Sequence, residues 1–238
     1  NRCGLQVADI VLEPLASATE VFRGTVDDVS VSAFVLRDAD GVAQATMISR
    51  GVSFFESETY LLTDKGPVRL PFPLKSSIQG LVGGKLVFSV EEDWAAQGLK
   101  QGDLAAFDLA AFKADPNAAR APLILRPTKA QAIEDVGITR NRLVVGLLEN
   151  VTGKALVFTP GDKGWTSRPL DLPANVTIAV GSASDRDDKV FFSVAGYLTP
   201  STLWLADAST GTLETLKSLP PKFDASKDVV EQFWATSK

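Results

Sequence analysis

The chain has 238 residues and a formal net charge of −5, and its 45% hydrophobic and 22% charged residues are ordinary for a globular protein. Lysine and arginine are scattered singly, so a phosphate-binding surface and a nucleic-acid partner are not expected. The sequence contains no histidine and a single cysteine, Cys3. A Ser-His-Asp or Cys-His catalytic arrangement, a histidine-type zinc site and an internal disulfide are therefore excluded within this chain.

No apolar run approaches the roughly 18 residues that a membrane-spanning helix needs, so no membrane partner is expected. The first six residues lack the apolar core of a signal peptide, and the compartment stays open between cytoplasm and periplasm. Asn150 and Asn175 each begin a glycosylation triplet, a pattern that is common by chance.

Short segments rich in Val, Ile, Leu, Phe and Thr, separated by Gly, Pro, Asp and Asn, predict strands and turns. The first set of four predicted strands covers 29–35, 45–49, 59–63 and 68–71. Residues 29–35 alternate between apolar and polar, so we expect one face of this strand to pack and the other to be polar.

The second set of predicted strands covers 78–82, 85–90, 103–108 and 123–127. Gly83-Gly84 predicts a two-residue hairpin turn, because glycine adopts positive φ without steric cost. The alanine-rich stretch 104–113 has helical composition, but we interpret it as a strand because the repeat requires one there.

The third set covers 136–139, 142–148, 155–159 and 168–173, and the fourth covers 176–180, 189–194, 201–206 and 213–216. These two sets align at an offset of 47 residues, with Asn141–Val145 over Asp188–Phe192. A four-strand unit that repeats at a near-constant interval is typical of a β-propeller blade. A β-sandwich is the alternative, although a sandwich has no reason to repeat its pattern.

We therefore predict an all-β protein, a β-propeller of about four blades with four antiparallel strands each. Residues 1–14 are unassigned, and 15–228 form a partial propeller with blades at about 29–73, 77–127, 131–173 and 176–220. Residues 229–238 are predicted to form a strand that leads out of the propeller.

Other candidate sites are weak. The acidic clusters Glu91–Asp93 and Asp185–Asp188 lack the ligand spacing of a calcium loop, and we interpret both as solvated turns. Residues 80–85 fail the spacing of a phosphate loop, because Leu86 stands where Ser or Thr is required. We predict no catalytic, metal-binding or cofactor-binding residue in this chain.

The four tryptophans differ in their surroundings. Trp204 lies within an apolar strand and is expected in the core. Trp94 and Trp165 lie in predicted turns and are the best candidates for contact with a small ligand, whereas Trp234 lies near the end of the chain.

A family resemblance rests on Val21–Thr25, Asp27–Val31, Glu58–Leu62, Ser77–Gly80, Glu92–Trp94, Gly196–Trp204 and Phe223–Lys238. Together these stretches resemble the propeller domain of the prolyl oligopeptidase family of serine peptidases, over roughly residues 15–238. The last stretch resembles the strand that leaves the propeller for the hydrolase domain. The resemblance implies a lid that restricts the active site to short peptides cleaved after proline.

Two departures limit what the resemblance implies. The family's propeller has about seven blades, whereas this chain has room for about four. No G-x-S-x-G nucleophile elbow occurs, so no catalytic residue of the family can be assigned and the chain is expected to be inactive alone.

The leading hypothesis is a non-catalytic propeller fragment of a prolyl oligopeptidase-like serine peptidase, which gates the access of peptide substrate by size and works together with a catalytic domain. A free-standing propeller that binds a small ligand or a protein is the alternative, and a histidine-free enzyme is the least favoured. Four blades of a larger ring would form an open arc with apolar flanks, so we expect a homodimer through exposed blade edges. A closed four-blade ring is the alternative arrangement.

Overall fold

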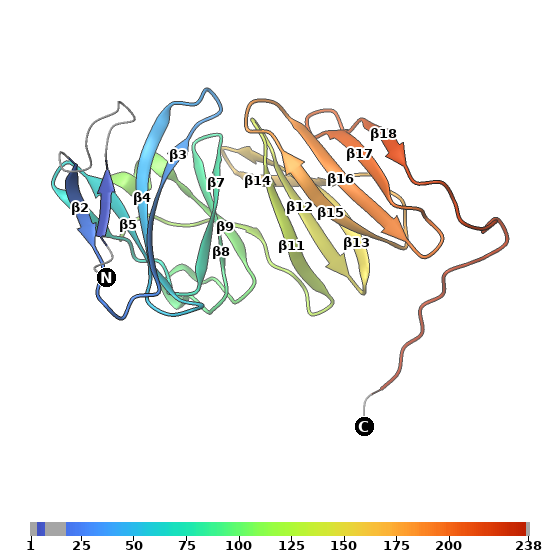
Figure 1. The fold of residues 1–238 in the computed structure, drawn as a ribbon, viewed down its shortest axis with the longest axis horizontal. Coiled ribbons are helices and arrows are strands. Elements are labelled where there is room, and N and C mark those ends of the chain that lie inside the picture. The colour runs from blue at the N-terminus through green and yellow to red at the C-terminus, as the bar shows by residue number, and fades with distance from the viewer. Residues whose placement is uncertain (1–3, 8–17, 237–238) are drawn as a thin grey trace. The chain divides into compact units, whose positions relative to one another are not determined.

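The computed structural model describes residues 4–7 and 18–236, with side chains from residue 18 onward. These residues form four four-stranded antiparallel sheets, each with its strands side by side in chain order, and one two-stranded sheet (Figure 1). The prediction of an all-β fold built from four blade-like repeats of four strands is confirmed. The chain divides into two compact units, residues 1–126 and 127–238.

The first unit contains two four-stranded sheets and the two-stranded sheet. The two-stranded sheet pairs β1 (Gly4–Val7) with β2 (Thr19–Arg23). The first four-stranded sheet comprises β3 (Ser30–Arg37), β4 (Ala43–Gly51), β5 (Ser57–Thr63) and β6 (Gly66–Arg69). The second comprises β7 (Ser76–Val82), β8 (Lys85–Val90), β9 (Leu104–Asp108) and β10 (Leu123–Leu125).

Aromatic side chains fill the core of the first unit. Phe107 stacks on Phe112 with ring centroids 4.3 Å apart, and Phe72 meets Phe88 edge-on at 5.1 Å. Phe72 is on the connection between the two sheets, so the same cluster closes the space between them. Offset and edge-on ring pairs of this kind add to the stabilisation that burial alone provides.

The predicted Gly83-Gly84 hairpin is present between β7 and β8. Both glycines have positive φ, 54° and 73°, as a two-residue turn of this type requires. The strand interpretation of 104–113 is correct only as far as Asp108. A short helix, α1 (Leu109–Ala114), follows, because the Asp108 side chain accepts a hydrogen bond from the Ala111 N–H and caps it.

The second unit contains the other two four-stranded sheets. One comprises β11 (Gln131–Ile138), β12 (Leu143–Glu149), β13 (Thr152–Gly161) and β14 (Gly164–Pro169). The other comprises β15 (Val176–Ala183), β16 (Lys189–Gly196), β17 (Thr202–Asp207) and β18 (Leu213–Ser218). Valines and Phe192 from facing strands form the shared core.

Residues that align at the 47-residue offset also touch one another. The Asp188 carboxylate accepts hydrogen bonds from the Asn141 backbone N–H at 2.8 Å and from the Asn141 side chain at 2.9 Å. The Thr139 hydroxyl donates a third, at 2.7 Å. Although burial opposes ionisation, these donors lower the pKa of Asp188 below its usual value. The offset is therefore the step from one sheet to the next.

Further strand predictions differ from the structure. The strand expected at 168–173 is β14, which ends at Pro169, because the following Leu170 turns into the core. The alternating residues 29–35 do not bury one full face: Val29 is 58% exposed and Val35 42%. Residues 229–236, the described part of the predicted exit strand, contain no strand, since no neighbouring strand pairs with them. Residues 237 and 238 lie outside the described residues.

Candidate functional site

The described residues contain no group of three or more His, Cys, Asp or Glu side chains that could hold a metal ion. Within the same part of the chain, no helix is both long and apolar enough to span a bilayer. The acidic clusters Glu91–Asp93 and Asp185–Asp188 both lie in connections between strands. In the first, Glu92 accepts a hydrogen bond from the Lys75 N–H at 3.0 Å and Asp93 accepts one from the Lys100 ammonium at 2.7 Å. The second is not simply solvated as predicted, because Asp188 is bonded to Asn141 and Thr139. Two surface features remain as candidates, a polar network in the first unit and an apolar surface in the second.

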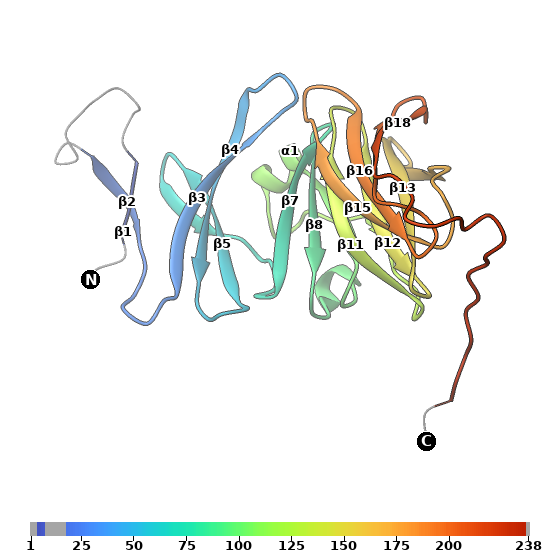
Figure 2. The same ribbon diagram turned by 45° about the vertical axis from the view of Figure 1, so that its right-hand side comes forward.

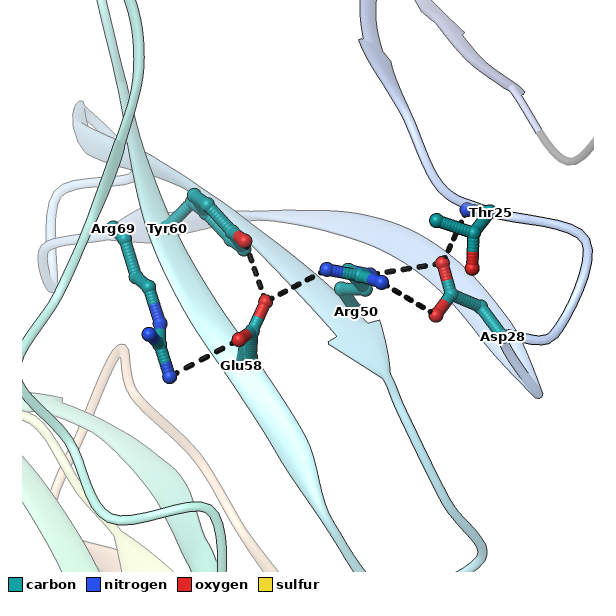
Figure 3. Close-up of polar contacts among 6 residues, drawn as sticks. All are labelled: Thr25, Asp28, Arg50, Glu58, Tyr60 and Arg69. Atoms are coloured by element: carbon teal, nitrogen blue, oxygen red, sulfur yellow. Dashed lines mark hydrogen bonds and ion pairs between the residues drawn. The ribbon is translucent and has the colours of Figure 1, made fainter.

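The polar network is centred on Arg50 at the end of β4 (Figure 3). The Arg50 guanidinium donates to both carboxylate oxygens of Asp28, at 2.8 and 2.9 Å, and to Glu58 at 3.0 Å. The Tyr60 hydroxyl donates to Glu58 at 2.6 Å, and the Arg69 guanidinium lies 3.0 Å from the other Glu58 oxygen. Asp28 belongs to the β2–β3 connection, so the network fastens that connection to the sheet.

The charges of the network are matched. Hydrogen bonding from Arg50 lowers the pKa of Asp28 to about 2, and the same contact raises the pKa of Arg50 above its usual value. Hydrogen bonding from Tyr60 lowers the pKa of Glu58, while burial and the bond to Glu58 raise the pKa of Tyr60. At neutral pH two carboxylates face two guanidiniums and a protonated phenol. None of these groups is a base that could take up a proton near neutral pH. We therefore interpret the network as structural: its charge-assisted hydrogen bonds hold backbone segments in place.

Two stretches that carried the family resemblance, Asp27–Val31 and Glu58–Leu62, meet in this network. Arg50 joins them, although no sequence pattern had marked Arg50 as a functional residue. The available signal was that Arg50 is the one charged residue of the strand Ala43–Gly51, since a charge that becomes buried there needs a partner.

We expect the network to make the stability of the protein decrease as the pH falls in the acid range. The depressed pKa of Asp28 means that its contribution is fully present above the unfolded value of about 3.9 and is lost as pH falls through about 2. Asp28→Asn should therefore lower the melting temperature at pH 6 and above, with the difference from wild type shrinking between pH 4 and pH 2. Thermal melts across this range measure it. Asp27→Asn, at the exposed neighbouring position, is the control, and a pH-independent gap for Asp28→Asn would contradict the assignment.

The second candidate is an apolar surface at one end of the second unit. A concavity of about 640 Å³ lies between the β16–β17 connection and the chain that follows β18, with Tyr197, Pro220 and Phe223 among its lining residues. Two smaller concavities, of about 400 and 320 Å³, adjoin Val151. We call the exposed side chains Val151, Tyr197, Phe223 and Trp234 the apolar rim; they are 71%, 87%, 56% and 77% exposed.

The apolar rim includes a turn with unusual backbone angles. Asn150 and Val151 form the two-residue turn between β12 and β13, with φ of 48° and 61°. A β-branched residue rarely adopts positive φ, and strain of this kind is concentrated at functional sites. The second glycosylation-type asparagine, Asn175, also has positive φ, 56°, and lines a concavity with Val151.

The tryptophans are placed differently from the sequence-based expectation. Trp94 packs against the aromatic core of the first unit, and Trp165 is half-buried in β14, so neither is a free platform for a ligand. Trp204 packs against the core of the second unit as predicted, although its indole N–H is buried without a hydrogen-bond partner. Trp234, which the sequence did not favour, is the exposed one and lies on the apolar rim.

Comparison with known sequences gives a consistent result. The family model described as "Prolyl oligopeptidase, N-terminal beta-propeller domain" matches residues 76–219. The chain is 38% identical to an uncharacterized peptidase, y4nA, of Sinorhizobium fredii over 95% of its own length and 32% of the relative's. It is 23% identical to an uncharacterized peptidase, RP174, of Rickettsia prowazekii over 94% of its own length and 32% of the relative's. The chain thus spans about a third of each of these relatives.

Solved structures resemble the chain over nearly its full length. A post-proline cleaving enzyme from Rickettsia typhi matches with a TM-score of 0.80 at 20% identity, covering 94% of this chain and 33% of that enzyme. Oligopeptidase B from Trypanosoma brucei matches with a TM-score of 0.62 at 16% identity, covering 92% of this chain and 31% of that enzyme. At these identities the likeness concerns the fold.

Proposed function

The chain belongs to the prolyl oligopeptidase family, as part of its N-terminal β-propeller domain, and on that premise we propose that it limits by size which peptides reach a serine-peptidase active site. The supporting observation is the family match over residues 76–219, a stretch made of blade-like sheets. The chain spans 32% of the Sinorhizobium fredii relative, and on this proposal the reaction is carried out outside the part that matches. Its own histidine-free sequence provides shape and exclusion, with chemistry located elsewhere.

Exclusion by size requires blades that stay packed against each other. In the second unit the contact between the two sheets is tight at Gly153, where an added Cβ would lie 2.5 Å from the Ile178 backbone nitrogen. A side chain at this position forces the sheets apart, and such a separation should admit larger substrates. Gly181, where an added Cβ meets nothing closer than 3.5 Å, offers a matched position without this effect.

The test uses a chimera in which this chain replaces the matching third of the Sinorhizobium fredii relative. We expect the chimera to cleave short proline-containing peptides and to reject long ones, and the isolated chain to cleave neither. Gly153→Ala, assayed below its melting temperature, should raise the ratio of long-peptide to short-peptide kcat/KM several-fold, whereas Gly181→Ala should leave it unchanged. A chimera that cleaves long and short peptides equally well, or a ratio that Gly153→Ala does not move, would contradict gating.

A second candidate function rests on the apolar rim and its 640 Å³ concavity. This surface suits a free-standing propeller that binds an apolar ligand or a protein segment. This alternative would be favoured over gating if the isolated chain binds such a ligand and the Tyr197→Ser substitution weakens the binding.

A further inference from the structure

A carboxylate links the first strands of the two sheets in the second unit. β11 and β15 lie against each other across the gap between these sheets (Figure 2). The Val180 backbone N–H of β15 donates a hydrogen bond to the Asp135 carboxylate of β11 at 3.0 Å. Asp135 and Val180 are both half-buried, so water competes only partly for this bond.

Irregular strand pairing brings the two groups together. β11 has a bulge between Ile133 and Asp135, and β15 has a bulge between Val180 and Ser182. A bulge disrupts the ladder of hydrogen bonds locally and redirects the side chain beside it. The accepting carboxylate and the donating N–H each lie beside one of these bulges, so the two irregularities face each other across the gap between the sheets.

Two glycines give the carboxylate room to reach β15. At Gly146 of β12, which is opposite Asp135 in the register, an added Cβ would lie 3.3 Å from the Asp135 Cβ. At Gly137 of β11, an added Cβ would lie 3.2 Å from the Val180 and Ala183 side chains of β15. Both distances are shorter than ordinary van der Waals contact, so a larger residue would displace Asp135 or push β15 away from β11. The local sequence therefore permits a close approach at this point.

Two other polar contacts between these sheets lie at different places. Asp188 bonds to Asn141 where the first and second strands of the two sheets are connected. The Arg168 guanidinium, on the fourth strand β14, donates to the Ala208 carbonyl at 3.0 Å. Asp135 acts at a third place, within the first strands themselves.

We propose that Asp135 is a positioning residue that sets the separation of β11 and β15 and, through it, the length of peptide that the propeller admits. The first strand of each propeller blade lines the central channel, so a gap between two first strands is a gap in the channel wall. When the Asp135 carboxylate is absent, the half-buried Val180 N–H loses its acceptor, and water enters between the strands to replace it. This inference rests on the proposed gating function and names one side chain on which the size limit depends.

Hydrogen exchange tests the link in the isolated chain. Asp135→Ala should speed exchange of the Val180 backbone amide by about tenfold or more, because the amide loses its acceptor. Asp135→Asn keeps a side-chain oxygen that can accept the bond, so it should restore most of the protection. Glu134→Ala, which removes an exposed carboxylate one residue away, should leave the exchange rate unchanged. Exchange at Val180 that Asp135→Ala does not alter would overturn the proposal.

The dependence of cleavage on peptide length, measured in the Sinorhizobium fredii chimera, tests the consequence. Below the melting temperature of each variant, Asp135→Ala should raise kcat/KM for long peptides several-fold and leave kcat/KM for short peptides unchanged. Asp135→Asn should return the long-peptide value towards that of the wild type. If Asp135→Ala does not fold, Gly146→Ala takes its place with the same expected direction, because its added methyl group crowds the Asp135 side chain.

Comparison with Gly153→Ala separates this inference from the proposed function. If Gly153→Ala raises the long-to-short ratio and Asp135→Ala does not, gating stands and the inference about Asp135 is wrong. If Asp135→Ala lowers kcat/KM for both peptides in parallel, its role is only structural and the inference is likewise overturned. If the chimera cleaves both lengths equally and neither substitution changes the ratio, the gating proposal fails, and the size limit assigned to Asp135 fails with it.

Discussion

Gly153→Ala is expected to destabilise the second unit by about 3 kcal/mol or more, since overpacking that no flexible side chain can relieve exceeds the usual cost of an added methyl group. The added Cβ would lie 2.5 Å from the Ile178 nitrogen and 2.9 Å from the Val176 oxygen, both backbone atoms of β15. Relief requires β13 and β15 to separate, which loosens the valine core between their sheets. Urea denaturation followed by tryptophan fluorescence measures the loss.

The control for this prediction is Gly181→Ala in the same unit. The nearest atom to its added Cβ is the Phe191 oxygen at 3.5 Å, an ordinary van der Waals distance. Replacement of a strand glycine at an unstrained position reduces the entropy of the unfolded chain, so a change between zero and a stabilisation of about 1 kcal/mol is expected. Equal destabilisation by the two substitutions would show that the tight approach at Gly153 is not what holds the sheets.

The sequence was most informative where a strand is central in its sheet. Central strands such as β8 and β12 are buried on both faces, so they appear in the sequence as continuous apolar runs. The Gly83-Gly84 turn between β7 and β8 was also predictable, because two consecutive glycines favour a two-residue hairpin turn. The 47-residue offset was visible because the two sheets of the second unit repeat the same order of strands. Asn141 and Asp188 both lie just before the second strand of their sheets, and they are hydrogen-bonded to each other.

Edge strands and local signals were harder to predict. The exposed middle of β14, Thr166 and Ser167, carries no hydrophobic pattern, whereas the buried Leu170 just beyond it imitates a strand. Helix α1 depends on a cap from the Asp108 side chain. Asp108 is also the last residue of the preceding strand, so its role as a helix cap could not be recognised from the sequence pattern. The β1–β2 pair escaped notice because a four-residue strand offers too little periodicity.

The polar contacts could not be predicted, because their partners are distant in sequence and neither partner has a motif. Arg50 and Asp28 are 22 residues apart, and Asp103 and Arg126 are 23 apart. Burial reveals such pairs only after the fold is known, since a buried carboxylate must find a donor. Asp103 is the clearest case, with a fully buried side chain at the start of β9.

Arg126→Ala is expected to destabilise the first unit by about 2–3 kcal/mol, because it leaves the buried Asp103 carboxylate with too few donors. The guanidinium donates to one oxygen at 2.9 Å and to the other at 2.5 Å, and the Lys100 backbone N–H supplies a further bond at 2.7 Å. The Arg126 side chain is 46% exposed, so water reaches the gap and the loss falls below that of a fully buried pair. Urea denaturation of the variant provides the measurement.

Two companion variants separate the ion pair from general effects of losing an arginine. Arg120→Ala removes a nearby arginine whose guanidinium donates to the Ala96 carbonyl at 3.3 Å, and it should cost less than about 1 kcal/mol. In the Arg126→Ala background, Asp103→Asn should recover part of the stability, because a neutral amide is cheaper to bury unpaired than a carboxylate. If Asp103→Asn instead adds a further, independent loss, then Arg126 does not act through Asp103, and packing of its aliphatic stem becomes the better explanation for its effect.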